Sequence, residues 1–225
     1  MTAIVLAGGF GTRLKSVLNN VPKPMADING KPFLLYLFEI LHKYNITTVI
    51  LSVGYKQEII KNYFNDKYKN ISILYSCEDT PLGTGGAIKK ALELVEIDKN
   101  VLVINGDTFF DINFETFFNS NKNYNLSLCI KPMKNFDRYG SVKIKENKII
   151  SFLEKKPIKE GYINTGIYCI NKNIFKNIKE KIFSFETFLE KQKDIYCYID
   201  DGYFIDIGIP EDYEKAKIDF RRLFW

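Results

Sequence analysis

A short run of glycines follows the first apolar stretch of the chain, and two basic residues lie close to it. The stretch Ala3–Ala7 is long enough for one buried strand, and the loop after it contains Gly8, Gly9, Gly11, Thr12 and Arg13. Glycine lets the backbone approach a ligand without a clash at Cβ, and the N–H groups of such a loop converge on anionic oxygens. Arg13 can hold phosphate through its planar guanidinium, and Lys23 follows between two prolines that restrict the chain. Strand, glycine loop and cations together predict a site for a nucleoside triphosphate.

The alternative interpretation of this loop is a plain turn with solvated basic side chains. Its G-G-x-G spacing differs from the G-x-G-x-x-G of Rossmann dinucleotide sites, and no Gly-Lys-Ser/Thr follows as in a Walker A loop. The whole string L-A-G-G-F-G-T-R-L, followed by P-K-P-M, is far more specific. It resembles the sugar-1-phosphate nucleotidyltransferases. The resemblance implies that Leu6, Ala7 and the glycine loop bind the nucleotide, that Arg13 holds the triphosphate and that Lys23 neutralises phosphate charge.

A second glycine-rich loop, residues 77–87, reads C-E-D-T-P-L-G-T-G-G-A and leads into an apolar helical pattern. On its own it could be a helix entry with Thr84 as the N-cap. It also matches the family's P-L-G-T-G-G-A string, which implies that Gly83 and Thr84 bind the nucleotide. In that pattern the residue five positions before Gly83 faces the base, and here that residue is Glu78.

The choice of glutamate at position 78 carries information about the base. A carboxylate offers acceptors and no donor, and guanine presents an N1–H beside an N2 amino group, so the two can pair through two hydrogen bonds. Uracil and thymine, with one N–H between two carbonyls, suit an amide better. Glu78 therefore favours guanine, although cytosine is also compatible, and a solvated glutamate at a strand end is the alternative.

Two aspartates are candidates for a divalent cation. Asp107 follows Gly106 directly after the apolar stretch 100–105, and Asp206 lies within the apolar run Tyr203–Gly208. Carboxylate oxygens are the ligands of hard cations, and a carboxylate is costly to bury without a partner. The alternatives are a helix cap for Asp107 and a salt bridge for Asp206. The family's G-D and D-x-G motifs imply that both bind Mg²⁺.

The second half of the chain carries the motifs that the family uses for the sugar phosphate. They imply a sugar site formed by Tyr139, Gly140, Glu154, Lys155, Asn164, Thr165 and Gly166. The family usually has E-K-P where this chain reads E-K-K-P. Alignment on the preceding Phe-Leu-Glu selects Lys155 as the lysine of the sugar phosphate, and alignment on K-P selects Lys156.

The reaction that this resemblance implies is an in-line attack of a sugar 1-phosphate on the α-phosphorus of a nucleoside triphosphate, with release of pyrophosphate. Arg13, Lys23, Lys155 and Asp107 are the predicted catalytic residues, and Mg²⁺ is the predicted cofactor. Within the family the chain is most similar to the guanylyltransferases that use GTP and D-glycero-D-manno-heptose 1-phosphate to make GDP-heptose for surface polysaccharides. There are two alternatives within the family. One is a guanylyltransferase for mannose 1-phosphate, and the other is a sugar-1-phosphate nucleotidyltransferase that uses CTP, UTP or dTTP. A non-catalytic nucleotide-sugar sensor is the alternative from another class.

These residues need a fold that brings the ends of several strands together. Strand-like stretches (3–7, 47–53, 71–77 and 100–105) alternate with helical spacing at 33–44, 57–64 and 88–95, the order of a doubly wound sheet. In such sheets ligands bind outside the carboxyl ends of the strands. We predict an α/β, Rossmann-like three-layer sandwich with a mixed, mainly parallel central sheet. It should form a single domain over 1–225, with a nucleotide-binding half of about 1–110 and a sugar-phosphate half of about 111–225.

The composition of the chain argues against several other classes of protein. The 225 residues carry a net charge of +5 with lysines and acidic residues interspersed, which argues against nucleic acid as a partner. No stretch approaches the length of a membrane span, and the N-terminus lacks the features of a signal peptide. The 4 cysteines form no C-x-x-C pair and are typical of reduced core residues, so we expect a cytoplasmic protein. The aromatic C-terminal end could pack on the core or form a homodimer contact.

Overall fold

The computed structural model describes residues 1–9, 11, 14, 18 and 20–224. In chain order the first half contains β1 (Thr2–Leu6), the short 3-10 helix η2 (Lys23–Met25), β2 (Asp27–Ile28), β3 (Lys31–Pro32), α1 (Phe33–Lys43), β4 (Thr48–Val53), α2 (Gln57–Phe64), β5 (Lys67–Tyr68), β6 (Ile71–Cys77), α3 (Gly83–Leu92), β7 (Asn100–Asn105) and β8 (Thr108–Phe110). The second half contains α4 (Phe114–Asn121), β9 (Leu126–Phe136), β10 (Ser141–Lys145), β11 (Lys148–Leu153), β12 (Ile158–Asn171), α5 (Phe185–Glu190), β13 (Ile195–Ile199), β14 (Phe204–Asp206) and α6 (Pro210–Phe224).

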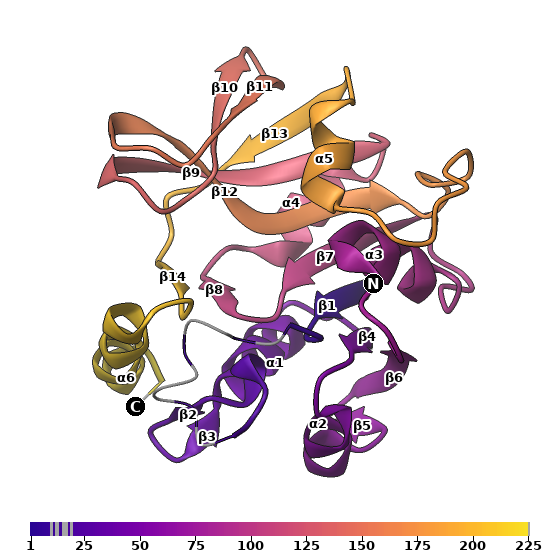
Figure 1. Ribbon diagram of the computed structural model, residues 1–225, viewed down its shortest axis with the longest axis vertical. Helices are drawn as coiled ribbons and strands as arrows, with labels where there is room; N and C mark the ends of the chain where they lie inside the picture. The colour runs from indigo at the N-terminus through magenta and orange to yellow at the C-terminus, as the bar shows by residue number, and fades with distance from the viewer. Residues whose placement is uncertain (10, 12–13, 15–17, 19, 225) are drawn as a thin grey trace.

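A large mixed sheet runs through the molecule. Its strand order is β10-β11-β13-β9-β12-β7-β1-β4-β6-β5 (Figure 1). In the first half β7, β1, β4 and β6 pair in parallel, which confirms the predicted alternation of strands and helices. The chain moves from β1 to β4 and β6 on one side and then returns to β7 on the other, so the order reverses at β1. That is the position where open α/β sheets bind their ligands.

The second half of the sheet is mostly antiparallel. There β12 pairs with β7 and β9, and β10 with β11 and β12, in antiparallel register, while β13 and β9 are parallel. The prediction of a mixed sheet is confirmed, but the sheet is not mainly parallel, because its parallel pairs are concentrated around β1 and most pairs of the second half are antiparallel. The register of β12 against β9 shifts between Asn164 and Ile167, where Gly166 has a φ of +75°. This bulge lies at the end of β7, next to the polar residues described below.

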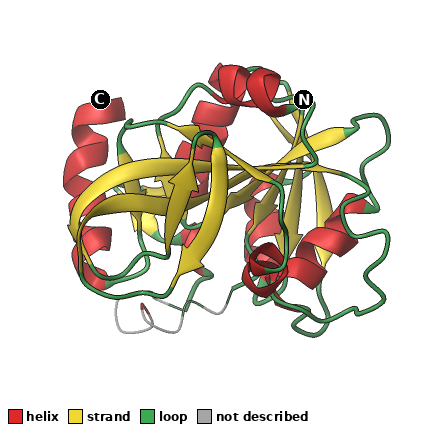
Figure 2. Ribbon diagram, turned by 90° about the horizontal axis from the view of Figure 1, so that it is seen from above, coloured by secondary structure: helices red, strands yellow, loops and turns green. Residues whose placement is uncertain are grey.

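The strands alternate their side chains between two hydrophobic clusters, one on each face of the sheet. Ala3 and Val5 of β1 enter a cluster with the apolar faces of α1, α2, α4 and α6, while Ile4 enters the cluster that contains α3 and α5. Figure 2 shows helices on both sides of the sheet. Three layers are therefore present, as predicted, and the strands between them are fixed by burial on both faces.

Local sequence signals set the ends of several helices. Asn113 caps α4 by accepting from the Thr116 N–H, and Ser184 caps α5 by accepting from the Thr187 N–H. The helix α6 begins at Pro210 with two acidic residues in its first turn, which suits the positive end of the helix dipole. The cap at Ser184 sets the start of the short helix α5 at Phe185.

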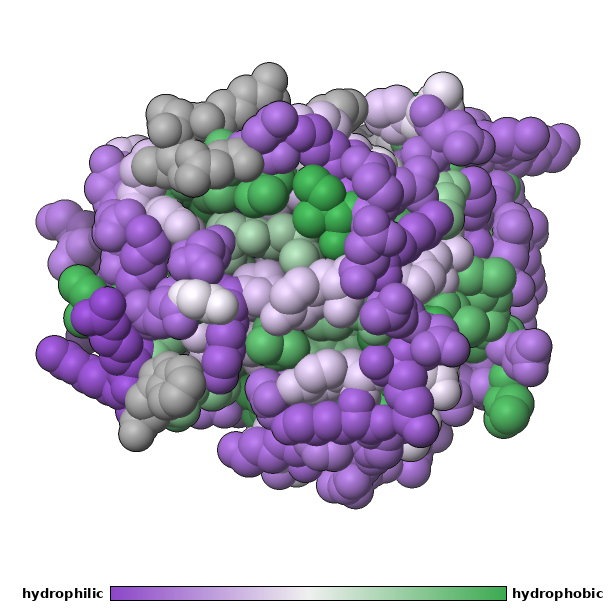
Figure 3. Space-filling model, turned by 90° about the horizontal axis from the view of Figure 1, so that it is seen from below, coloured by the Kyte–Doolittle hydropathy of each residue, from purple (hydrophilic) through white to green (hydrophobic). Residues whose placement is uncertain are grey.

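Hydrophilic side chains cover most of the face seen in Figure 3, and apolar side chains are exposed in smaller groups among them. Single exposed apolar side chains, such as Tyr63, Leu74 and Leu223, are normal for a globular surface. Within the described part of the chain, the helices are all too short or too polar to cross a membrane.

Candidate active site

The first of two adjoining cavities opens at the carboxyl ends of β1, β4 and β6. It has a volume of about 500 Å³. Most of the residues predicted to bind the nucleotide line it, namely Leu6, Gly8, Gly9, Glu78, Gly83, Thr84 and Asp107. Ala7 does not, because its side chain is buried and its N–H donates to the Ser52 carbonyl oxygen at 2.8 Å. Its part is to attach the start of the glycine loop to β4.

The carboxylate of Glu78 is held from several sides. The Ser52 hydroxyl donates to its Oε1 at 3.2 Å, and the Leu82 N–H donates to its Oε2 at 3.0 Å. A Cβ on Gly8 would lie 3.1 Å from Oε1, so a glycine there leaves room for the carboxylate. Each oxygen has two lone pairs, and the protein uses one on each. One acceptor position per oxygen therefore remains for a ligand.

The glycines of the second loop have a structural role that the sequence interpretation did not include. A Cβ on Gly83 would lie 2.6 Å from the Phe183 carbonyl oxygen, and one on Gly85 would lie 2.2 Å from the Phe183 ring. The Gly85 N–H also donates to that carbonyl. These glycines let α3 pack closely against the segment before α5. The N-cap of α3 is Leu82 and not Thr84. The Thr84 hydroxyl donates instead to the Glu186 carboxylate.

The second cavity, of about 340 Å³, adjoins the first and contains charged groups of both signs. Leu6, Gly9 and Asp107 line both cavities, so the two share one wall. The other lining residues of the second cavity include Gly11, Lys23, Lys155, Asp206 and Gly208. The predicted residues Thr12 and Arg13 lie outside the described residues.

A small two-stranded sheet brings the two predicted metal ligands together. β8 starts directly after Asp107 and pairs antiparallel with β14, which ends at Asp206. The Ile207 N–H donates to the Asp107 carbonyl oxygen at 3.0 Å and continues this ladder. Gly106 lets the chain pass close to β1, because a Cβ there would lie 2.6 Å from the Leu6 carbonyl oxygen. Two aspartates that are far apart in the sequence thus face one another at the end of β1.

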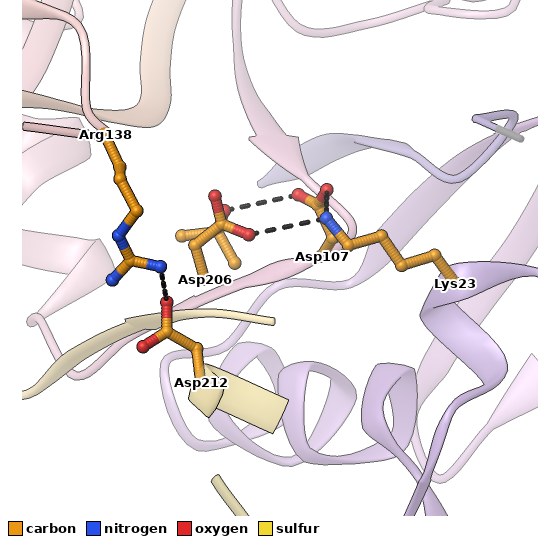
Figure 4. Close-up of polar contacts among 6 residues, drawn as sticks. Lys23, Asp107, Arg138, Asp206 and Asp212 are labelled. Carbon is orange, nitrogen blue, oxygen red and sulfur yellow. Dashed lines mark hydrogen bonds and ion pairs between the residues drawn. The ribbon is translucent and has the colours of Figure 1, made fainter. Parts of the chain in front are cut away.

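Lys23 connects the two carboxylates. Its ammonium lies 2.5 Å from Oδ2 of Asp107 and 3.4 Å from Oδ1 of Asp206 (Figure 4). Burial lowers the pKa of Lys23, but the charges of both aspartates outweigh it, so the pKa is raised overall. Burial and the neighbouring Asp107 raise the pKa of Asp206. Two carboxylates this close need a cation between them, and in this structure the ammonium of Lys23 supplies it.

The structure separates the two candidate lysines in E-K-K-P. Both lysines are exposed, but Lys155 lines the second cavity together with Asp107 and Asp206, whereas Lys156 lines neither cavity. The neighbouring Glu154 is also exposed and lines neither. Of the residues predicted in this turn, only Lys155 lines a cavity together with the two aspartates.

The other predicted sugar residues lie where β10 meets β12. The Asn164 N–H donates to the Gly140 carbonyl oxygen at 2.8 Å, and the Tyr139 ring packs edge-on against Phe204, near Asp206. Burial, together with the Asp212 carboxylate, raises the pKa of Tyr139 to about 12, so its phenol remains a hydrogen-bond donor at neutral pH.

Thr165 and Gly166 were both predicted to belong to the sugar site, and the structure gives each of them a role within the fold. The Thr165 hydroxyl donates to the Cys129 carbonyl oxygen at 2.6 Å, and its side chain is buried. It therefore supports the bulge in β12 rather than a bound sugar. A Cβ on Gly166 would lie 2.3 Å from Nδ2 of Asn105, so this glycine makes room for the Asn105 side chain.

Several residues of the site were not predicted from the sequence. Ser52 and Asn105 line the first cavity, and both are polar residues at the end of an apolar strand, which is a signal that could have identified them. Glu186 lines it too, but it comes from a distant helix. Arg138 forms an ion pair with Asp212 at 2.8 Å beside the aspartates, and neither partner had a recognisable spacing (Figure 4).

Comparison with known proteins agrees with this geometry. The profile of the family described as "Nucleotidyl transferase" matches residues 2–222. The D-glycero-alpha-D-manno-heptose 1-phosphate guanylyltransferase of Aneurinibacillus thermoaerophilus is 52% identical, over 96% of this chain and 97% of that protein. The protein of the same name from Campylobacter jejuni is also 52% identical, over 97% of this chain and 100% of that protein. A crystal structure of HddC from Yersinia pseudotuberculosis complexed with GMP-PN has a TM-score of 0.89 and 41% identity, and the match covers 97% of this chain and 99% of that one.

Proposed function

The chain belongs to the nucleotidyl transferase family, and from this premise we propose that it is a sugar-1-phosphate guanylyltransferase. The reaction would join GTP and D-glycero-alpha-D-manno-heptose 1-phosphate to give GDP-heptose and pyrophosphate. The observation that carries the proposal is the pair of adjoining cavities. One presents the fixed Glu78 carboxylate, and the other presents two lysines and two aspartates. The 52% identity to two heptose 1-phosphate guanylyltransferases supports the choice of sugar.

The charges of the two cavities suggest how the nucleotide lies. Among the described lining residues, the first cavity has Glu78, Asp79, Asp107 and Glu186 and no lysine or arginine, whereas the second has Lys23 and Lys155. The N1–H and N2 amino groups of guanine are donors and suit the carboxylate of Glu78. The phosphates suit the lysines of the second cavity. The α-phosphorus would then lie near the shared wall formed by Leu6, Gly9 and Asp107.

In the reaction, an oxygen of the sugar 1-phosphate forms a bond to the α-phosphorus, and the bond from the α-phosphorus to the leaving pyrophosphate breaks. This chemistry requires positioning and charge neutralisation rather than a nucleophilic side chain. We propose that Lys155 holds the sugar phosphate and that Lys23 stabilises the charge that develops on the reacting phosphates. Arg13, which lies outside the described residues, is proposed for the departing pyrophosphate.

Mg²⁺ fits the carboxylates of this site. Among the described residues no group of three or more His, Cys, Asp or Glu side chains could hold a metal ion, so Asp107 and Asp206 would need further ligands. Mg²⁺ is commonly bound by one or two carboxylates together with substrate phosphates, which is what these two residues would provide. The ion would neutralise charge on the bound phosphates. We expect Asp107→Ala to abolish turnover, and near-normal turnover in that variant would contradict the assignment.

The sugar would lie beyond the second cavity, against the β10–β12 junction. Tyr139 supplies a phenol there and Gly140 supplies backbone, whereas the Asn164 side-chain oxygen already accepts from the Gly166 N–H at 2.9 Å and from the Tyr168 hydroxyl at 3.1 Å. We further propose that residues 1–225 act as one domain, since a single sheet contains strands of both the nucleotide half and the sugar half. Four free cysteines agree with a reducing compartment such as the cytoplasm.

The test is a pyrophosphate-release assay with Mg²⁺ and a panel of GTP, CTP, UTP, dTTP and ATP, each with heptose, mannose and glucose 1-phosphate. Release with GTP and heptose 1-phosphate alone supports the proposal. Release with GTP and mannose 1-phosphate keeps the guanylyltransferase and changes the sugar. Release only with UTP or dTTP refutes the role of Glu78. Binding of GTP without release for any sugar would indicate a nucleotide-sugar sensor instead.

A further inference from the structure

Ser52 is a polar residue at the end of β4 and is fully buried. Its neighbours in the strand, Leu51 and Val53, belong to the hydrophobic core. The exposed fraction of Ser52 is 0%, so a bound nucleotide would not contact this side chain directly. Its hydroxyl nevertheless reaches the first cavity, because it donates to Oε1 of Glu78 at 3.2 Å.

The bond from Ser52 is one half of a clamp on Glu78. The other half is the Leu82 N–H, which donates to Oε2 at 3.0 Å. The Glu78 N–H also donates to the Val53 carbonyl oxygen at 2.8 Å, and this attaches the backbone of Glu78 to the end of β4. With one donor on each oxygen, rotation of the carboxylate plane would break at least one of the two bonds.

We propose that Ser52 is a specificity-determining positioning residue that makes the site prefer guanine to bases without a 2-amino group. The inference rests on the proposed function, in which Glu78 reads the N1–H and N2 amino groups of guanine. Both donors must meet an oxygen at the same time, so the preference depends on the orientation of the carboxylate plane as well as on its charge. Ser52 fixes that plane without touching the nucleotide.

Inosine nucleotides are the appropriate probe. Hypoxanthine keeps the N1–H and the 6-oxo group of guanine and lacks only the 2-amino group. A hydrogen bond from that amino group to a carboxylate should make kcat/KM for GTP about 10-fold or more higher than for ITP in the unmodified enzyme. We expect Ser52→Ala to reduce this GTP/ITP ratio by about 3-fold to 10-fold, because a carboxylate free to rotate holds the two donors less well.

Ser76 provides a matched control. It lies on the neighbouring strand β6, directly opposite Ser52 in the parallel register, and it is also buried, with 3% of its surface exposed. Its hydroxyl has no hydrogen-bond partner among the described residues. Ser76→Ala therefore makes the same chemical change at a similar depth, and it should leave the GTP/ITP ratio unchanged. A general packing defect would lower the rate for both nucleotides alike and would not change their ratio.

The experiment measures kcat/KM with GTP and ITP for the unmodified protein, Ser52→Ala, Ser76→Ala and Glu78→Gln. Competition of GDP and IDP for a fluorescent GDP analogue gives the same preference without turnover. A lowered ratio in Ser52→Ala alone among the two serine variants supports the inference. A ratio that is equal in the unmodified protein and in Ser52→Ala overturns it, and the proposed function then remains in place. If the unmodified protein does not prefer guanine and Glu78→Gln changes nothing, the proposed function fails as well.

Discussion

Replacing Lys23 by methionine would remove the ammonium between Asp107 and Asp206 while keeping most of the aliphatic stem. Lys23→Met should therefore leave two carboxylates facing each other without a cation. The side chain of Lys23 is 14% exposed, and those of the aspartates are 32% and 33% exposed. The ion pairs of Lys23 with the two aspartates are thus partly buried, between the fully buried and the fully exposed case.

The size of the effect follows from that position. Removing one partner of a fully buried ion pair costs about 3–5 kcal/mol, and an exposed pair contributes about 0–1 kcal/mol. We therefore expect a loss of about 2 kcal/mol in the free energy of unfolding when no divalent cation is present. For a chain of this size that corresponds to a decrease in Tm of about 4–8 °C.

Mg²⁺ or Mn²⁺ should then act differently on the two proteins. In the unmodified protein an ion at the two aspartates must displace the ammonium, whereas in Lys23→Met the carboxylates are free to bind it. A ligand that binds only the folded state raises stability more when it binds more tightly. Added Mn²⁺ should thus raise the Tm of the variant by more than that of the unmodified protein, and Mn²⁺ titrations followed by electron paramagnetic resonance should show tighter binding.

Differential scanning fluorimetry with and without EDTA measures the first effect, and Lys156→Met serves as the control, since Lys156 is exposed and lines neither cavity. The reasoning is refuted if Lys23→Met is as stable as the control without metal. It is also refuted if Mn²⁺ raises both Tm values by the same amount.

Two further predictions concern other lysines and an acidic side chain. Lys155→Ala should lower kcat/KM by about 100-fold or more, because it removes a charge at the reacting phosphates, whereas Lys156→Ala should stay within about 3-fold of the unmodified protein; steady-state kinetics on both variants checks this, and equal losses would count against Lys155. Burial raises the pKa of Glu39, but hydrogen bonds from Lys69 and Tyr68 outweigh this effect and hold the pKa below its ordinary value. The ionised Glu39 therefore stabilises the fold at pH values above its unfolded pKa. This contribution disappears as the pH falls through the folded pKa. Because the pair is partly exposed, Glu39→Gln should lower stability by less than about 1 kcal/mol at pH 7. In thermal scans the gap to the unmodified protein should close as the pH falls through the lowered pKa of Glu39.

The parallel half of the fold could be predicted because its signals are local. Strands β4 and β7 are continuous apolar runs, and the helix over α1 has clear helical spacing, so the predicted and observed bounds nearly coincide. Strand β8 was not predicted, because three residues after Asp107 show no periodicity. Its existence depends on pairing with β14, almost a hundred residues later in the chain.

The candidate site divides in the same way. The residue types at Glu78, Asp107 and Asp206 could be assigned from motifs, since each belongs to a short string at a strand end. The contacts between them could not, because the Lys23 ammonium meets Asp206 across 183 positions of sequence. The position of Ser52 near the end of an apolar strand marks it as a candidate, but its contact could not be predicted, because its partner Glu78 lies 26 residues away. Thr165 matched a sugar motif by type, but the bulge in β12 turns its hydroxyl toward Cys129.

The end of β1 contributes to both cavities, the one proposed for the base and the one proposed for the phosphates. Leu6 and Gly9 line both cavities. The Gly106 N–H donates to the Leu6 carbonyl oxygen at 2.9 Å, which attaches the residue before Asp107 to the end of β1. Strands buried on both faces hold such positions more rigidly than a loop could. A base that fits poorly at Glu78 would then also shift the α-phosphorus relative to the second cavity, and small misplacements of reacting atoms are costly. Selection against the wrong nucleotide should for this reason lower kcat as well as raise KM.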